Sequence, residues 1–239
     1  MVHILSWLND FFSCPNERIK LEKEIKDLKI DISSLKNDIE LLKSLNISEF
    51  EQYLDNLKLP VMTLTYTKRW VFNKKNIIKM NICDFIRDEK SLPKLKNINK
   101  IFELPIKYHF DNFKEHGLLD FWQLPIETLL LGKGDCDDSG VLRASLARRL
   151  GNNNVFCALG FMNGVGHLFN MTMIDKKIYI LENTSNMYMP ILVNNIKDSS
   201  IVGYQIYFIF NENKCWCIRP GNFNSHSRDK ILKAFSIKL

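Results

Sequence analysis

Hydrophobic residues recur every seven positions through residues 16–47, with isoleucine and leucine on one seam. The a positions hold Ile25, Ile32 and Ile39, and the d positions hold Leu21, Leu28, Leu35 and Leu42. Isoleucine at a with leucine at d favours a parallel, two-stranded coiled coil. The pattern therefore predicts an N-terminal coiled-coil helix, 16–47, through which the chain self-associates.

The charged flanks of this seam favour pairing between chains. Across a parallel dimer, acidic g positions would face lysines at e positions: Glu24 with Lys29, Asp31 with Lys36 and Asp38 with Lys43. Opposite charges at these positions stabilise a coiled coil. The alternative is a lone amphipathic helix packed on its own globular domain, because Ile30 and Leu41 lie off the seam. The number of chains in the assembly stays open.

Later in the chain, the heptads give way to short apolar and alternating runs that predict an antiparallel sheet. Strands are expected at 155–162, 167–174, 178–182 and 201–210, with a short partner at 214–218. Residues 167–174 and 178–182 are separated by a tight turn, so they predict a hairpin.

Helices are expected around this sheet, which gives an α+β fold class. They cover 47–59, 98–113 with a break or kink at Pro105, 136–150 before the C-cap Gly151, and 228–235. Residues 61–72 are typical of a strand or hairpin, and 74–94 of an irregular linker. We divide the chain into an apolar N-terminal segment at 1–15, the coiled-coil helix at 16–47, linker and peripheral elements at 48–96, and a domain at 97–239.

The first 15 residues are apolar and aromatic, but they have no positively charged n-region and they include Asp10. They do not resemble a signal peptide, and they are too short to span a membrane. We expect them to pack as an amphipathic anchor against protein or, as the alternative, against a lipid surface.

Composition places the chain among ordinary globular proteins, with 46% hydrophobic and 25% charged residues. The net charge of +6 comes without a compact basic block, which disfavours nucleic acid as a partner. The six cysteines are dispersed along the chain, unlike a disulfide framework. We expect the cytoplasm or another reducing compartment, where a catalytic thiol stays free.

Cys136 stands at the start of the helix predicted to end at Gly151. Asp135 is a favourable N-cap, and Asp138 follows three positions later as in a capping box. The free amides and dipole of a helix N-terminus stabilise the thiolate, which is the nucleophilic form. The carboxylates of Asp135, Asp137 and Asp138 oppose this, so a basic partner is needed. The alternative is a small, buried cysteine without reactivity.

His167 and Glu182 are expected at neighbouring ends of the predicted hairpin. This places a carboxylate within reach of an imidazole, and together with Cys136 it supplies the parts of a thiol acyl-transfer site. Trp122 and Gln123, upstream of the cysteine, are candidates to hold an oxyanion with the Cys136 amide. The alternative for Trp122 is packing against the helix.

The segment from Asp120 to Thr184 resembles the transglutaminase-like cysteine protease superfamily, most closely its bacterial and archaeal transglutaminase-like cysteine proteinase branch. The matching motifs are DFWQLPIETLLLGKGDCDD before the cysteine helix, GH at the histidine strand, and LENT, where the family usually has an aspartate followed by Pro-Thr. The resemblance implies a papain-like α+β domain with helices packed on an antiparallel sheet.

The same resemblance implies roles for the candidate residues. Cys136 would be the nucleophile, His167 the general base and acid, and Glu182 the residue that orients His167, with Asn183 as an alternative orienting residue. Some relatives bind calcium through acidic residues flanking the cysteine. By this resemblance, the weak candidate calcium ligands are Asp135, Asp137 and Asp138. Capping of the helix is the favoured alternative, so no metal and no other cofactor is expected.

The expected function is that of a thiol protease, which cleaves a peptide or isopeptide bond through a catalytic triad and an acyl-enzyme. Acyl transfer to an amine, as in transglutaminase cross-linking, is one alternative, since it uses the same residues. The other is a non-catalytic structural protein, such as a virion component, that assembles through the coiled coil around an inherited enzyme fold.

Overall fold

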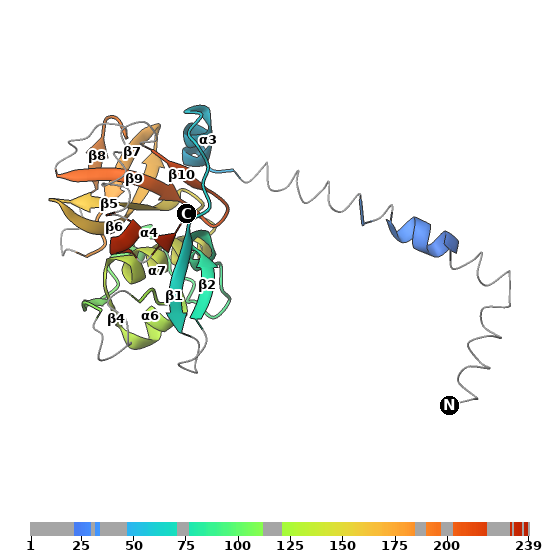
Figure 1. The fold of residues 1–239 in the computed structure, drawn as a ribbon, viewed down its shortest axis with the longest axis horizontal. Coiled ribbons are helices and arrows are strands. Elements are labelled where there is room, and N and C mark those ends of the chain that lie inside the picture. Colours follow the sequence, from blue (N-terminus) through green and yellow to red (C-terminus); the bar gives the residue numbers. More distant parts are fainter. Residues whose placement is uncertain are drawn as a thin grey trace. The chain divides into compact units, whose positions relative to one another are not determined.

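The computed structural model describes residues 22–29, 32–33, 47–70, 77–111, 121–184, 190–196, 203–218, 230, 232–235 and 237–238 (Figure 1). The chain divides into two compact units, Met1–Ile47 and Ser48–Leu239. Within the described ranges, no helix is both long enough and apolar enough to cross a membrane.

In the first unit, residues 22–29 and 32–33 are helical. Three residues of the predicted seam are exposed on this helix: Ile25 at 49%, Leu28 at 59% and Ile32 at 52%. The pairing of two chains is not shown, so the coiled coil stays a prediction. The apolar segment 1–15 and the other seam residues lie outside the described residues.

A six-stranded antiparallel sheet forms the centre of the second unit, in the order β10-β9-β5-β6-β7-β8. Its strands are β5 (Val155–Met162), β6 (Val165–Ile174), β7 (Lys177–Leu181), β8 (Ile191–Val193), β9 (Tyr204–Phe210) and β10 (Cys215–Cys217). The predicted strands and the β6–β7 hairpin are confirmed. Strand β8 was not indicated by the sequence pattern.

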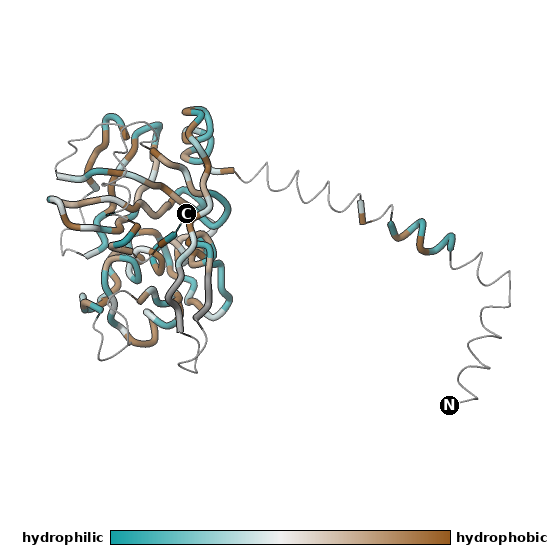
Figure 2. Tube along the Cα trace, viewed as in Figure 1, coloured by the Kyte–Doolittle hydropathy of each residue, from teal (hydrophilic) through white to brown (hydrophobic). Residues whose placement is uncertain are grey.

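Both faces of this sheet are covered, which explains the continuous apolar run of β5. One face packs in a core with α7 (Cys136–Arg149), and β5 contributes Val155 and Leu159 to it. The other face packs against α3 (Glu49–Asn56), where the rings of Phe50 and Phe156 lie 4.8 Å apart. Figure 2 shows hydrophilic and hydrophobic residues mixed along α3, and the buried residues of this helix include Phe50 and Leu54. The α+β class, with helices on an antiparallel sheet, is confirmed.

A smaller sheet, in the order β11-β1-β2, belongs to the same unit. It contains β1 (Thr65–Trp70), β2 (Ile77–Asn81) and β11 (Ile237–Lys238), and β2 leads into the short helix η1 (Ile82–Phe85). The irregular linker expected at 74–94 is therefore wrong at β2 and η1. The expected division between 48–96 and 97–239 stays a prediction, although Tyr66 and Phe85 lie in the same core as α7.

The helix expected at 98–113 is wrong after Phe102. Here α4 (Ile98–Phe102) ends at the C-cap Glu103, and β3 (Lys107–Tyr108) pairs in parallel with β4 (Lys133–Gly134), which follows α6 (Pro125–Leu131). Pro105 lacks an N–H group and disfavours helical geometry in the preceding residue. The chain therefore extends and runs beside the segment that leads into α7.

Candidate active site

Cys136 is the first residue of α7 and is 7% exposed. The helix begins with a capping box, in which Asp135 accepts a hydrogen bond from the Asp137 backbone N–H and Asp138 accepts one from the Asp135 N–H. The Cys136 Sγ lies 4.0 Å from Oδ1 of Asp137, whose negative charge favours the neutral thiol. Formation of a thiolate here therefore needs a base, in spite of the favourable helix dipole.

Asp138 connects this helix to the loop before α6. Its Oδ1 accepts a hydrogen bond of 2.6 Å from the Gln123 backbone N–H, and its Oδ2 accepts the bond from Asp135. Burial, followed by the nearby charge of Asp135, raises the pKa of Asp138 well above its usual range. Each oxygen of this carboxyl therefore accepts a hydrogen bond from a backbone N–H group.

His167 and Glu182 form a buried pair at the end of the hairpin. Leu181 pairs with Asn170, so Glu182 follows the last ladder position and reaches back to the start of β6. Its Oε1 and Oε2 lie 3.1 and 3.2 Å from Nε2 of His167. This contact assigns the Nε2 proton, which leaves Nδ1 of the neutral ring with the lone pair that a base requires.

Glu182 is held in place by further donors. Oε1 accepts hydrogen bonds from the Asn183 and Thr184 backbone N–H groups at 2.9 Å and from the Thr184 hydroxyl at 2.8 Å, while Oε2 accepts one from the Tyr204 hydroxyl at 2.5 Å. Burial by itself raises the pKa of Glu182, but hydrogen bonding and charge from His167, with the two hydroxyl donors, lower it to about 2. The carboxylate is therefore ionised at neutral pH.

Asn183 joins this pair to the first turn of α7. Its side-chain Nδ2 donates a hydrogen bond of 3.1 Å to the Cys136 carbonyl oxygen. A Cβ atom at Gly140 would lie 2.7 Å from that Nδ2 and 2.1 Å from Cδ2 of Leu168. The glycine in the α7 interior thus permits close packing of the segments that carry Cys136, His167 and Glu182. The structure brings these three predicted residues into one neighbourhood.

Trp122 and Gln123 are both buried near this neighbourhood. The Trp122 ring lies among aromatic rings at centroid distances of 5.2–6.5 Å: Tyr66, Phe85, Phe210 and Phe235. Packing in a core is thus the main role visible for Trp122. Gln123 contributes its backbone N–H to Asp138. Donation of either side chain to an oxyanion stays a prediction.

Tyr108 is a further residue beside the cysteine. The parallel β3–β4 ladder pairs Tyr108 with Gly134, two residues before Cys136. Burial, followed by negative charge on Cys136, Asp135, Asp137 and Glu182, raises the pKa of Tyr108. The sequence interpretation missed it because the expected helix at 98–113 concealed the pairing. It also missed Tyr204, which an alternating strand pattern does not distinguish from other core aromatics.

The acidic residues flanking Cys136 offer a limited metal site. Ligand atoms of Asp135, Cys136 and Asp137 all lie within 4.8 Å of one another. Calcium takes six to eight oxygen ligands, whereas this group offers two carboxylates and a sulfur, and Asp138 already holds two backbone N–H groups. The contacts fit capping, and we assign no metal to the cluster.

The sequence matches no protein-family model and no curated protein. Among solved structures, Legionella pneumophila LapG is similar at 15% identity and a TM-score of 0.42, over 64% of this chain and 83% of LapG. Its calcium-bound form gives 16% identity, a TM-score of 0.42, and coverage of 64% and 84%. Its EGTA-treated form gives 14% identity with the same TM-score and coverage. Likeness at this level assigns neither a family nor an activity to the chain.

Proposed function

We propose that this chain is a thiol-dependent hydrolase with a papain-like, transglutaminase-like domain that cleaves a peptide or isopeptide bond of a protein or peptide substrate. The observation that supports it most is the buried His167–Glu182 pair, linked to the Cys136 carbonyl through Asn183. A cysteine nucleophile needs a base whose second nitrogen is held by a fixed acceptor.

The proposed reaction begins when Nδ1 of His167 takes the proton of the Cys136 thiol. The thiolate attacks the carbonyl carbon, and the C–N bond breaks as the imidazolium gives its proton to the leaving nitrogen. Water, losing a proton to His167, then attacks the thioester, and the C–S bond breaks to release the acid and restore the thiol. Ionised Glu182 stabilises the imidazolium in both halves of the reaction.

Acyl transfer to an amine differs only in the group that attacks the thioester, so the same three residues serve both reactions. A non-catalytic assembly protein is the alternative of another class. It would retain the fold without requiring Cys136 to ionise near neutral pH. The reactivity of the thiol therefore separates the assembly protein from both enzymes.

The test is the pH dependence of iodoacetamide labelling at Cys136, followed by mass spectrometry, in wild type, His167→Ala and the control His109→Ala. Other thiols serve as internal references, because burial raises the pKa of Cys83 to about 12 and also raises those of Cys157 and Cys215. We expect fast labelling of Cys136 below pH 8 that only His167→Ala abolishes. Equal and slow labelling in all three proteins would support the assembly protein.

Self-association through 16–47, in parallel, is a separate part of the proposal. It is supported by the exposed seam residues Ile25, Leu28 and Ile32. Sedimentation of the full chain should show a dimer or larger assembly that Leu28→Asp with Ile32→Asp converts to monomer. The control Lys26→Asp lies at an outer b position and should leave the assembly intact. A monomeric wild type at micromolar concentration would contradict it.

A further inference from the structure

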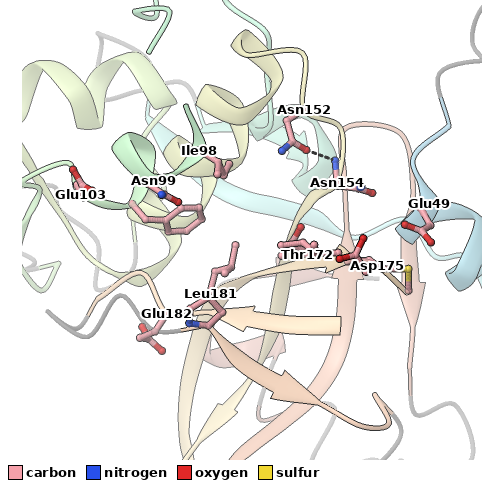
Figure 3. A pocket seen from close by; sticks show the side chains of 14 residues that line it. Glu49, Ile98, Asn99, Glu103, Asn152, Asn154, Thr172, Asp175, Leu181 and Glu182 are labelled. Carbon is pink, nitrogen blue, oxygen red and sulfur yellow. Dashed lines mark hydrogen bonds between the residues drawn. The ribbon is translucent and has the colours of Figure 1, made fainter. Parts of the chain in front are cut away.

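A cavity of about 590 Å³ lies beside β6 and β7, and neither Cys136 nor His167 lines it (Figure 3). Its walls come from α4, the end of β6 with the following turn, the end of β7, the loop after α7 and the first residue of α3. The volume is in the range of sites that hold small ligands or short peptide segments. Glu182 forms part of the wall, so the cavity adjoins the candidate active site.

The charged residues of this lining are all acidic. Four carboxylates line the cavity, Glu49, Glu103, Asp175 and Glu182, and the described lining includes no lysine, arginine or histidine. The whole chain has a net charge of +6, so the charge of the cavity lining is opposite in sign to the net charge of the protein. Acidic residues around a concave, partly apolar site attract cations.

The four carboxylates differ in their availability to a ligand. Glu182 is engaged by His167, and Glu103 pairs with Lys100. No hydrogen bond or ion pair with another described residue engages the side-chain carboxylate of Glu49 or of Asp175, and both residues are exposed. In Figure 3 the side chains of Glu49 and Asp175 lie toward the same end of the cavity, beside Thr172 and Asn154. A cationic group would find at that end two carboxylates that pair with no basic side chain of the described residues.

The remaining lining is apolar or carries amides. The apolar members are Ile98, Phe102, Met173, Ile174, Leu181 and Pro190. The amides of Asn99, Asn152 and Asn154 can each donate and accept, as a peptide backbone requires. Lysine and arginine combine an apolar stem with a cationic head, and they match this combination of surfaces.

We propose that this cavity binds a basic segment of the polypeptide substrate, with lysine or arginine heads at Glu49 and Asp175. The identification of this segment as part of a substrate rests on the proposed function, whereas its binding in the cavity does not require the protein to be an enzyme. The segment would lie against Leu181 and Glu182, and the chain would continue from there toward Cys136. The cavity thereby selects substrates that carry positive charge near the bond to be cleaved.

The test uses the full chain carrying Cys136→Ser and fluorescein-labelled decapeptides in which alternate residues are lysine, glutamine or glutamate. Fluorescence anisotropy should show binding of the lysine peptide, with an affinity that falls as salt rises, and weaker or no binding of the other two. In the same background, Glu49→Gln with Asp175→Asn should weaken lysine-peptide binding about tenfold. The control Asp88→Asn with Glu89→Gln removes two charges outside the cavity and should leave the affinity unchanged.

Equal binding of the three peptides, or equal loss in the cavity variant and its control, would overturn the proposal. Tighter binding of spermine than of the lysine peptide would contradict a polypeptide ligand. Failure of the two proposals can be told apart. If lysine-peptide binding depends on Glu49 and Asp175 while Cys136 labels as an ordinary thiol, the cavity stands and the hydrolase does not.

Discussion

Asp138 and Glu182 are two buried carboxyls of the same unit whose pKa values move in opposite directions. They are 1% and 8% exposed, and both accept hydrogen bonds from backbone N–H groups. Burial and the charge of Asp135 raise the pKa of Asp138, whereas His167 and the hydroxyl donors outweigh burial and lower that of Glu182 to about 2. The two carboxyls share burial and backbone donors, so the opposite directions of their pKa shifts follow from the neighbouring groups: acidic Asp135 beside Asp138, and His167 with the hydroxyl donors beside Glu182.

The difference separates a structural carboxyl from one suited to catalysis. Asp138 ties the Gln123 loop to α7 beside Cys136, surrounded by other acids. Glu182 faces a base that can become positive, so its own charge stabilises the imidazolium.

Glu182→Gln should slow iodoacetamide labelling of Cys136 about a hundredfold at pH 6.5. Without the carboxylate, the imidazolium is not stabilised, and an unassisted thiol with a pKa near 8.5 is about 1% ionised at that pH. Asp138→Asn should change the rate by less than about threefold, because Asp138 accepts hydrogen bonds from the backbone N–H groups of Gln123 and Asp135 and makes none with His167. Labelling rates from mass spectrometry measure both, and equal losses in the two variants would remove the distinction between the carboxyls.

The free energy of unfolding should also separate the carboxyls as pH falls. Glu182 stabilises the fold above its ordinary pKa of 4.5, and this contribution, about 3 kcal/mol, is lost as pH falls from 4.5 to about 2. The contribution of Asp138 to the free energy of unfolding changes with pH in the opposite direction. It is present below the ordinary pKa of 3.8 and is lost as the pH rises through the raised pKa of the folded state. Urea denaturation of wild type and both variants between pH 2 and 7 tests this, and a Glu182→Gln curve parallel to wild type would contradict it.

Tyr204→Phe should lower the free energy of unfolding by about 2 kcal/mol, because it removes a hydrogen bond to an ionised carboxylate. It should also slow Cys136 labelling, although less than Glu182→Gln does. The control Tyr179→Phe removes a hydroxyl from β7 of the same sheet and should have little effect on either quantity. Indistinguishable behaviour of the two phenylalanine variants would exclude Tyr204 as a positioning residue.

Gly140→Ala should cost about 1 kcal/mol, because the added methyl meets Leu168 and Asn183 while alanine improves helix propensity. In a Leu168→Ala background, the same substitution should cost less, since the closest atom has been removed. Thermal or urea unfolding of the four proteins gives the coupling. Equal costs in both backgrounds would show that the packing of Leu168 against Gly140 does not limit the size of the residue at position 140.

The local parts of this site could be predicted from the sequence. Asp135 and Asp138 indicate the start of α7, and the turn between 167–174 and 178–182 places His167 near Glu182. Both could be predicted because helix caps and hairpins depend on residues that are close in sequence. Tyr204 and Tyr108 could not be predicted, since β9 and β3 reach the site through strand pairing between distant segments. The prediction of a helix at 98–113 was wrong for the same reason, because the spacing of apolar residues does not reveal that residues 107–108 pair with 133–134.

The most direct test of the triad is a double-mutant cycle on the rate of Cys136 labelling at pH 6.5. It compares wild type, His167→Ala, Glu182→Gln and the double variant. If Glu182 acts through His167, each single variant should fall to the rate of an unassisted thiol, and the double variant should be no slower than His167→Ala. Losses that multiply, or wild-type rates in both single variants, would contradict a coupled Cys136–His167–Glu182 site.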